Sequence, residues 1–319
     1  MRKARIVSVA FPKGGYGSVE ENRRQMVAHL EQTADYEPDF VCFTEVAREL
    51  GTMNDDSAWE GEPIPGETTM AVGEAAKAIG THAIVGMHER VGGETFNAAA
   101  LIGRDGEVIG RYHKVQPTVN EMDGKAVRPG GKGITFDTDL GKVGMLICFD
   151  LKFPEVAMSL ARNQARIAFF PSMFNGGTRH QSITRDYGMF LVVSQGHESV
   201  IVDMCGRRLG WQGYNEPLVE QGKLAPFAFA EVNLDCKAYH LDFNQGKLGD
   251  IQDKYGFGIQ FEIMRPEATF VMSSLMDNVS VEDIETEFEL EDMWSYYDRS
   301  RGVRGERRLP GEHVSPLGV

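Results

Sequence analysis

The sequence contains no apolar run that approaches the roughly 18 residues needed to span a bilayer. Its N-terminal stretch is basic and then only briefly apolar, too short for the apolar region of a signal peptide. Cysteine is scarce as well, and Cys42, Cys148, Cys205 and Cys236 lack the close spacing of a zinc site or a disulfide framework. These absences predict a protein of a reducing compartment, the cytoplasm, with no membrane partner.

Positive charge is also in short supply. The chain has 33 Lys and Arg against 47 Asp and Glu, which gives a net charge of −14 and a pI near 5.1. Nucleic acids and anionic membranes are polyanions, so this balance argues against both as general partners. The sequence also lacks a His-Xaa-Xaa-Xaa-His pair, a P-loop and a dinucleotide-binding glycine fingerprint, so we expect neither a metal nor an organic cofactor.

What the sequence does contain is an alternation of strand-like and helix-like segments, which is typical of an α/β layered domain. Helices are predicted at 19–34, 68–79 and 154–164, the first of them preceded by a capping box of Ser18 and Glu21. The predicted strands are 6–11, 40–43, 83–87, 98–102, 108–112, 143–147, 167–170, 190–193, 200–202 and 227–232. Many strands and few long helices suggest two sheets packed face to face with helices outside.

The character of the chain changes near residue 272. Residues 282–292 are dense in acid, and arginines follow at positions 299, 301, 304, 307 and 308. One interpretation is a solvated or partly disordered tail of opposite charge blocks. Trp294, Tyr296 and Tyr297 lie between the blocks and favour instead an arm that docks on a partner subunit. We therefore divide the chain into a domain of residues 1–271 and an extension of residues 272–319.

Three ionisable residues each follow a predicted strand: Glu45, Lys114 and Cys148. Taken separately, Glu45 could cap a helix, Lys114 could be a surface lysine and Cys148 could be a buried thiol. If the three strands are neighbours, however, their side chains converge at one edge of a sheet, where ligands bind in α/β folds. A thiol, a carboxylate and an ammonium at one place can serve as nucleophile, base and oxyanion donor.

The segments around these residues resemble the nitrilase, or carbon–nitrogen hydrolase, superfamily. The matches are Phe43-Thr44-Glu45, Tyr112-His113-Lys114-Val115 and the stretch from Gly144 through Cys148-Phe-Asp-Leu-Lys-Phe-Pro-Glu155. Flanking phrases agree as well: Phe96-Asn97-Ala98-Ala99, Arg128-Pro129-Gly130 and Arg265-Pro266-Glu267. The resemblance covers residues 4–271 and implies an α/β fold, the four-layer α-β-β-α sandwich of the family, in homodimers or larger homo-oligomers.

The resemblance also implies a role for each residue. Cys148 is the nucleophile, and its thiol, with an ordinary pKa of about 8.5, needs a base or a positive environment before it attacks a carbonyl or nitrile carbon. Glu45 is that base, while Lys114 and the backbone N–H of Phe149 hold the oxyanion. Glu121 matches a second glutamate that orients the substrate and the lysine in many members. The alternative for Glu121 is a solvated loop carboxylate.

The residues after Cys148 bear on the substrate. The pair Phe149-Asp150 differs from the Trp-Glu pair of true nitrilases, and the stretch up to Glu155 is more similar to omega-amidase-like relatives. Lys152 is placed to meet a substrate carboxylate, as a cation does in related carbamoyl amino acid hydrolases, or it is a solvated lysine. Phe174 is expected to contact substrate too, whereas residues 184–188 depart from the family pattern at one wall of the pocket.

The sequence therefore predicts an amidase that cleaves a small linear amide through a cysteine thioester and releases ammonia or an amine. N-carbamoyl compounds and nitriles are the alternative substrates for the same three residues, and an acyltransferase would pass the same thioester to an amine. A non-catalytic interaction protein on this fold is the alternative of another class. The presence of Glu45, Lys114 and Cys148 together argues against that alternative.

Overall fold

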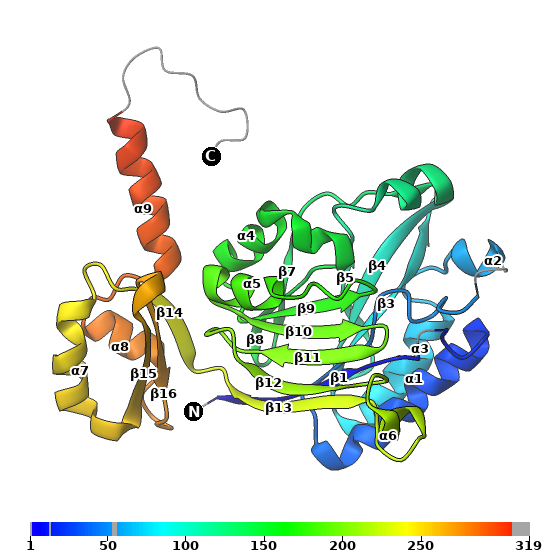
Figure 1. Cartoon of the computed structure of the whole chain (residues 1–319), viewed down its shortest axis with the longest axis horizontal. Coiled ribbons are helices and arrows are strands. Elements are labelled where there is room, and N and C mark those ends of the chain that lie inside the picture. Colours follow the sequence, from blue (N-terminus) through cyan, green and yellow to red (C-terminus); the bar gives the residue numbers. More distant parts are fainter. Residues whose placement is uncertain (1, 13, 53–55, 308–319) are drawn as a thin grey trace. The chain divides into compact units, whose positions relative to one another are not determined.

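The computed structural model describes residues 2–12, 14–52 and 56–307 (Figure 1). The chain forms two compact units, one of Arg2–Leu234 and one that begins at Asp235. The boundary after residue 271 that we expect from the sequence falls within strand β16 (Thr269–Ser274), which pairs with β14 (Cys236–His240). Because this pairing holds residues from both sides of position 271 in one sheet, the second unit begins earlier than expected.

The first unit contains two sheets (Figure 1). One has the order β13-β1-β2-β3-β4-β5, with β6 paired to β4, and the other has the order β12-β11-β10-β9-β8-β7. The strands of the first sheet are β1 (Lys3–Val9), β2 (Phe40–Cys42), β3 (His82–Val91), β4 (Glu94–Ile102), β5 (Val108–His113), β6 (Val127–Arg128) and β13 (Phe227–Asn233). Those of the second are β7 (Thr135–Thr138), β8 (Gly141–Met145), β9 (Ile167–Ser172), β10 (Phe190–Gln195), β11 (Glu198–Val202) and β12 (Arg208–Gly213).

Helices cover the outer faces of both sheets. Met26 of α1 (Val19–Thr33) and Val72 of α3 (Glu67–Ile79) share one buried apolar cluster with strands of the first sheet. Helices α4 (Pro154–Arg162) and α5 (Arg179–Tyr187) cover the second sheet (Figure 1). Two short helices, α2 (Asp56–Trp59) and α6 (Pro217–Glu220), lie in connections. The layers therefore follow the order α-β-β-α, which confirms the expected sandwich.

The second sheet packs against the first sheet on one face and against helices on the other, and the side chains of β9 alternate between these two faces. The ring of Phe169 lies 5.3 Å from that of Phe40 in the first sheet, whereas the ring of Phe170 lies 5.8 Å from His180 of α5. Successive strand residues point to opposite faces, so one phenylalanine packs between the sheets and the next packs under the helix.

Helix starts follow the expected signals with one exception. Pro154 occupies the first turn of α4, as its missing N–H favours. The Ser18 hydroxyl accepts a hydrogen bond from the Glu21 N–H at 3.1 Å and caps α1. The Glu21 carboxylate, however, accepts from the side chain of Gln25 at 2.9 Å, so only the Ser18 half of the capping box is observed. In the described part of the chain, no helix has both the length and the apolar character that a membrane span requires.

The second unit is built on the antiparallel sheet β14-β16-β15, with β15 spanning Ile259–Met264. Its helices are α7 (Leu248–Tyr255), α8 (Val281–Glu287) and α9 (Met293–Glu306). The acid-rich segment is therefore part of a folded unit and not a solvated tail, because Val281, Ile284 and Leu290 are buried in one core with Tyr239 and Phe270 of the sheet.

The aromatic residues between the charge blocks also pack within this unit. Tyr296 donates its hydroxyl to Asp242 at 2.8 Å, and the rings of Trp294 and Tyr297 meet edge to face at 5.7 Å. Docking of this segment on a partner subunit stays a prediction. Residues 308–319, including Arg308, lie outside the described residues.

Candidate active site

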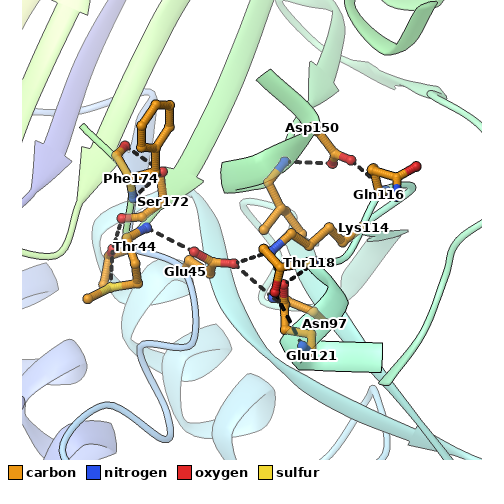
Figure 2. Close-up of polar contacts among 12 residues, drawn as sticks. Thr44, Glu45, Asn97, Lys114, Gln116, Thr118, Glu121, Asp150, Ser172 and Phe174 are labelled. Carbon is orange, nitrogen blue, oxygen red and sulfur yellow. Dashed lines mark hydrogen bonds and ion pairs between the residues drawn. The ribbon is translucent and has the colours of Figure 1, made fainter. Parts of the chain in front are cut away.

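The two sheets of the first unit are joined by hydrogen bonds close to Glu45. The Thr44 hydroxyl donates to the carbonyl of Ser172 at 2.9 Å, and the N–H of Met173 donates to Glu45 Oε2 at 2.8 Å (Figure 2). These bonds connect the end of β2 in one sheet with the end of β9 in the other. The Glu45 carboxylate is thus held where the carboxyl ends of strands from both sheets meet.

Lys114 is the centre of a buried hydrogen-bonded group. Its Nζ lies 2.8 Å from Glu45 Oε1 and 2.8 and 2.9 Å from the two carboxylate oxygens of Glu121 (Figure 2). Asn97 Nδ2 donates to both Glu45 Oε1 and Glu121 Oε1 at 2.8 Å. The side chain of Lys114 is only 1 % exposed, so its charge is balanced by these carboxylates and not by solvent. Glu121 is therefore a hydrogen-bond partner of the lysine, which excludes the alternative of a solvated loop carboxylate.

A single π-helical turn, residues Asn120–Gly124, carries Glu121 to this position. The N–H of Thr118 donates to Glu121 Oε2 at 2.7 Å, while the hydroxyl of Thr118 accepts from the N–H of Glu121 at 3.2 Å. This reciprocal pair fixes the carboxylate before the turn begins. The turn is short and its sequence contains no periodic pattern, so its geometry was not predictable from the sequence.

Burial and neighbouring charges act against each other in this group. Burial alone would lower the pKa of the Lys114 ammonium, but the charges of Glu45, Cys148 and Glu121 raise that pKa overall. Burial would raise the pKa of Glu121, but the nearby Lys114 ammonium and the Thr118 N–H lower it overall. Lys114 is thus a cation and Glu121 an anion throughout the neutral pH range.

Cys148 lies where β8 gives way to a 3-10 turn, Cys148–Lys152, that leads into α4. Its φ of 46° is in the left-handed region, which a residue with a Cβ adopts only when its surroundings hold it there. Burial raises the pKa of the Cys148 thiol to about 12, the charge of Glu45 adds to the rise, and that of Lys114 opposes it. The sulfur is therefore protonated at neutral pH and lies within electrostatic reach of both Glu45 and Lys114.

The other residues expected at the substrate lie near Cys148 and Glu45 along the chain or through their contacts. Phe149 follows Cys148, and its ring meets that of Phe153 at 5.2 Å. The ammonium of Lys152 lies 4.7 Å from the centre of the Phe174 ring, an arrangement that favours cation–π attraction. Phe174 is itself fixed by Ser172, whose hydroxyl accepts from the Phe174 N–H at 2.9 Å and donates to its carbonyl at 2.7 Å.

The segment 184–188 forms the last turn of α5, which ends at Gly188 with a φ of 65°. A cavity of about 280 Å³ lies beside this helix. Its lining includes Asn175, Thr178, His180, Gln181, Glu198 and Arg208. Asn175 follows Phe174 directly, so the loop after β9 borders this cavity at one end and Glu45 at the other.

Sequence reasoning missed three contributors to the site. Asn97 bridges the two glutamates, the Met173 N–H binds Glu45, and Asp150 is fully buried with three hydrogen bonds of its own. Asn97 and Asp150 both stand within phrases that carry the family resemblance, which was the available signal. In the described part of the chain, no group of three or more His, Cys, Asp and Glu side chains is arranged to hold a metal ion.

Comparisons with known proteins identify the family of this chain. The family model described as "Carbon-nitrogen hydrolase" matches residues 5–199. Human omega-amidase NIT2 is 32% identical over 122 residues, which is 36% of this chain and 44% of that protein, and omega-amidase NIT2-B of Xenopus laevis gives the same figures. The match thus spans less than half the length of these relatives.

Solved structures with the same fold have lower identity. The Nit3 protein of Saccharomyces cerevisiae, described as a member of branch 10 of the nitrilase superfamily, has a TM-score of 0.62 at 20% identity, over 72% of this chain and 90% of its own. A carbon-nitrogen hydrolase of Helicobacter pylori has a TM-score of 0.62 at 17% identity, over 80% and 94%. Since the family model covers more than half of the chain, this chain belongs to the carbon–nitrogen hydrolase family.

Proposed function

We propose that this protein hydrolyses the carbon–nitrogen bond of a small linear amide through a thioester on Cys148. The observation that supports the proposal most strongly is the buried Lys114 ammonium, hydrogen-bonded to Glu45 and Glu121 and coupled electrostatically to the Cys148 thiol. A cation, a carboxylate and a thiol at one site are the groups that acyl transfer from an amide requires. The names of the omega-amidase relatives point to the same reaction.

In the first half of the reaction, the sulfur of Cys148 attacks the amide carbonyl carbon while its proton passes to Glu45. The high pKa of the thiol makes this transfer necessary, because almost no thiolate exists at neutral pH without a base. The carbonyl electron pair moves onto oxygen, where Lys114 and the Phe149 N–H stabilise the charge. The C–N bond then breaks, and Glu45 returns the proton to the leaving amine.

In the second half, water attacks the thioester carbon. Glu45 takes a proton from that water, the oxyanion forms again opposite Lys114, and the C–S bond breaks. The products are a carboxylic acid and the Cys148 thiol, which recovers its proton from Glu45. Glu121 keeps the lysine ammonium in place throughout, because it occupies two of the ammonium's donors.

The arrangement of Lys152 and Phe174 favours a substrate that bears an anionic group. The Lys152 ammonium lies over the Phe174 ring, and Phe174 directly follows the residue whose N–H binds Glu45. An aromatic face and a cation together favour a short chain that ends in a carboxylate. We therefore expect a lower KM for an amide that carries a carboxylate than for a neutral amide of the same length.

The test is release of ammonia from a panel of neutral amides, acidic amides, N-carbamoyl amino acids and nitriles. We expect wild type to act on amides, with a loss on the order of 10³-fold or more in Cys148→Ala because the nucleophile is gone. Cys205→Ala, which removes another partly buried thiol, is the matched control. Mass spectrometry of the trapped adduct on Cys148 identifies the acyl half of the substrate.

Equal rates in wild type and Cys148→Ala would contradict the proposal and favour a non-catalytic interaction protein. Turnover of carbamoyl compounds or nitriles without turnover of amides would show that the same three residues act on one of the alternative substrates. Consumption of an added amine in place of water would identify an acyltransferase.

A further inference from the structure

Asp150 is a buried carboxylate, two residues after Cys148, whose interactions the proposed reaction does not use. It is 0 % exposed. Its Oδ1 accepts from the N–H of Gln116 at 2.8 Å (Figure 2). Its Oδ2 accepts from the N–H of Ile147 at 2.9 Å and from the hydroxyl of Tyr112 at 2.7 Å. The carboxylate is thus held by protein donors on both of its oxygens.

The three donors lie directly beside the two groups that the reaction uses. Ile147 precedes Cys148, at the end of the second sheet's β8, whereas Tyr112 and Gln116 stand two residues before and two residues after Lys114, at the end of the first sheet's β5. A single carboxylate therefore ties the residue before the thiol to the Tyr112 side chain on one side of the lysine and to the Gln116 backbone on the other. Strand pairing does not join β5 to β8 in the described sheets, since they belong to different sheets.

We propose that Asp150 is a positioning residue that sets the separation between the Cys148 sulfur and the Lys114 ammonium; this inference rests on the proposed function. The left-handed φ of Cys148 requires such a support, because a turn of this kind relaxes when its neighbours release it. The Asp150 N–H also donates to the carbonyl of Ile147 at 3.0 Å, so backbone and side chain of Asp150 close the same turn. The carboxylate fits this position because it only accepts, and every partner donates.

Asp150→Asn is the direct test. The asparagine has the same shape, but its NH₂ replaces one acceptor oxygen and must face a donor, so at least one of the two connections opens. The matched control is Asp203→Asn. Asp203 is also buried and its Oδ1 accepts from the N–H groups of Cys205 at 2.9 Å and Arg207 at 2.8 Å, but it lies in the turn between β11 and β12.

Two measurements separate positioning from a purely structural role. The first is the rate at which iodoacetamide alkylates Cys148 between pH 6 and 10, which requires no substrate. Lys114 lowers the pKa of the thiol, so a more distant lysine leaves less thiolate at each pH. We expect the alkylation profile of Asp150→Asn to move to higher pH, while that of Asp203→Asn stays with wild type.

The second measurement is the division of any loss between kcat and KM. Displacement of a reacting group by about 1 Å can reduce rates on the order of 10²-fold, so we expect kcat to fall by that amount in Asp150→Asn with KM little changed. Tyr112→Phe removes one donor of the three and is expected to shift both readouts in the same direction by less. If Asp150→Asn does not fold, Tyr112→Phe decides the matter in its place.

Unchanged alkylation and kcat in the folded Asp150 variant, or changes no larger than those of Asp203→Asn, would overturn the positioning role. Wild type that hydrolyses no amide, combined with a shifted Cys148 profile in Asp150→Asn, would overturn the proposed function and leave the positioning role supported. If wild type hydrolyses amides and the alkylation profile of Asp150→Asn stays unshifted, the proposed function is supported and the positioning role is overturned.

Discussion

Two groups of buried polar and charged residues lie beside each other in the first unit. They differ in the hydrogen bonds and partner charges that surround their carboxylates. The Glu45 group consists of Glu45, Asn97, Lys114 and Glu121. The Glu49 group consists of Arg48, Glu49, Glu62 and His88. The groups adjoin because His88 of β3 and Asn97 of β4 are direct cross-strand partners, whose side chains share one face of the sheet.

In the Glu45 group, all four carboxylate oxygens accept hydrogen bonds. Glu45 Oε1 binds Lys114 and Asn97, Glu45 Oε2 binds the Met173 N–H, and Glu121 binds Lys114 through both oxygens. Two carboxylates thus share one ammonium. Buried charges of this kind remain ionised because the partner charge and the donors replace the lost hydration.

In the Glu49 group, one carboxylate oxygen is left unmet. Glu49 Oε1 accepts from Arg48 Nη1 at 2.8 Å and from the His88 N–H at 3.0 Å, but Oε2 is buried without a partner in the described part of the chain. Arg48 is divided between Glu49 and Glu62, to which its Nε donates at 3.1 Å. Burial consequently raises the pKa of Glu49 to about 7 despite the nearby arginine.

The difference shows what keeps a buried carboxylate charged. One cation lies close to both carboxylates of the Glu45 group, and it lowers the pKa of Glu121 while its own pKa is raised. The neighbouring group has a cation too, but fewer donors, and it titrates.

Lys114→Met should have the largest effect on the Glu45 group, because it leaves two buried carboxylates without their cation. We expect a loss of about 3–5 kcal/mol in the free energy of unfolding at pH 7, together with loss of the proposed activity. The loss should shrink as the pH falls below the ordinary pKa of glutamate, because protonated carboxyls need no cation. Urea unfolding at several pH values measures both effects.

Lys125→Met is the matched control for that experiment. The Lys125 side chain is exposed, and its ammonium lies 3.2 Å from the centre of the Trp59 ring. A cation–π contact at an exposed site contributes only about 0.5–1 kcal/mol. A Lys114 variant no less stable than the Lys125 variant would show that the buried ammonium does not hold the Glu45 group together.

Glu49→Gln tests the titration of the second group. The folded-state pKa of about 7 lies above the ordinary 4.5, so between these values the folded protein binds more protons than the unfolded chain. Stability contributed by Glu49 is thus complete below pH 4.5 and is lost as the pH rises to about 7, by about 3 kcal/mol in total at 1.36 kcal/mol per pH unit. Glutamine cannot ionise, so the stability of the variant relative to wild type, measured by urea unfolding, should increase over that pH range.

The control for Glu49→Gln is Glu94→Gln. Glu94 is exposed and paired with Arg128, which lowers its pKa, so its contribution is constant between pH 4.5 and 7 and is lost only as the pH falls below 4.5. Parallel stability curves for wild type and Glu49→Gln between pH 4.5 and 7 would mean that Glu49 does not titrate in this range.

Much of this arrangement was predictable because its signals are local. The apolar run before Cys148 and Pro154 after it mark the strand and the helix on either side of Cys148, and Glu45 and Lys114 likewise follow strands. The bridging donor Asn97 carried no structural signal of this kind, only its place in a phrase of the family resemblance. It lies inside a strand, and only the pairing of β4 with its neighbours and the π-helical turn of Glu121 bring its amide between two carboxylates.

The C-terminal segment was misjudged for a different reason. Charge density alone suggested a solvated tail, but Val281 and Ile284, three residues apart on α8, bury one face of that helix. Ser280 caps the same helix by accepting from the N–H of Asp283 at 3.1 Å. Both signals were in the sequence, yet a short amphipathic helix has few apolar residues, and an average over charged neighbours hides them.

The smallest of the expected effects tests how the backbone supports the Glu45 group, at two adjacent glycines. The Gly130 N–H donates to the carbonyl of Lys114 at 2.8 Å, and a Cβ on Gly130 would lie 2.3 Å from the carbonyl oxygen of His113. A Cβ on Gly131 would have nothing within 4 Å. We expect Gly130→Ala to cost about 1–3 kcal/mol and to displace Lys114, whereas Gly131→Ala stays near wild type.

Urea unfolding and the pH profile of Cys148 alkylation measure the two consequences separately. Gly130→Ala should lower stability and also move the alkylation profile to higher pH, since the backbone that carries the lysine shifts. If stability falls without a change in the profile, the Glu45 group keeps its geometry through its own hydrogen bonds. In that event the shared ammonium, and not the packing of the backbone behind it, is what distinguishes this group from the Glu49 group.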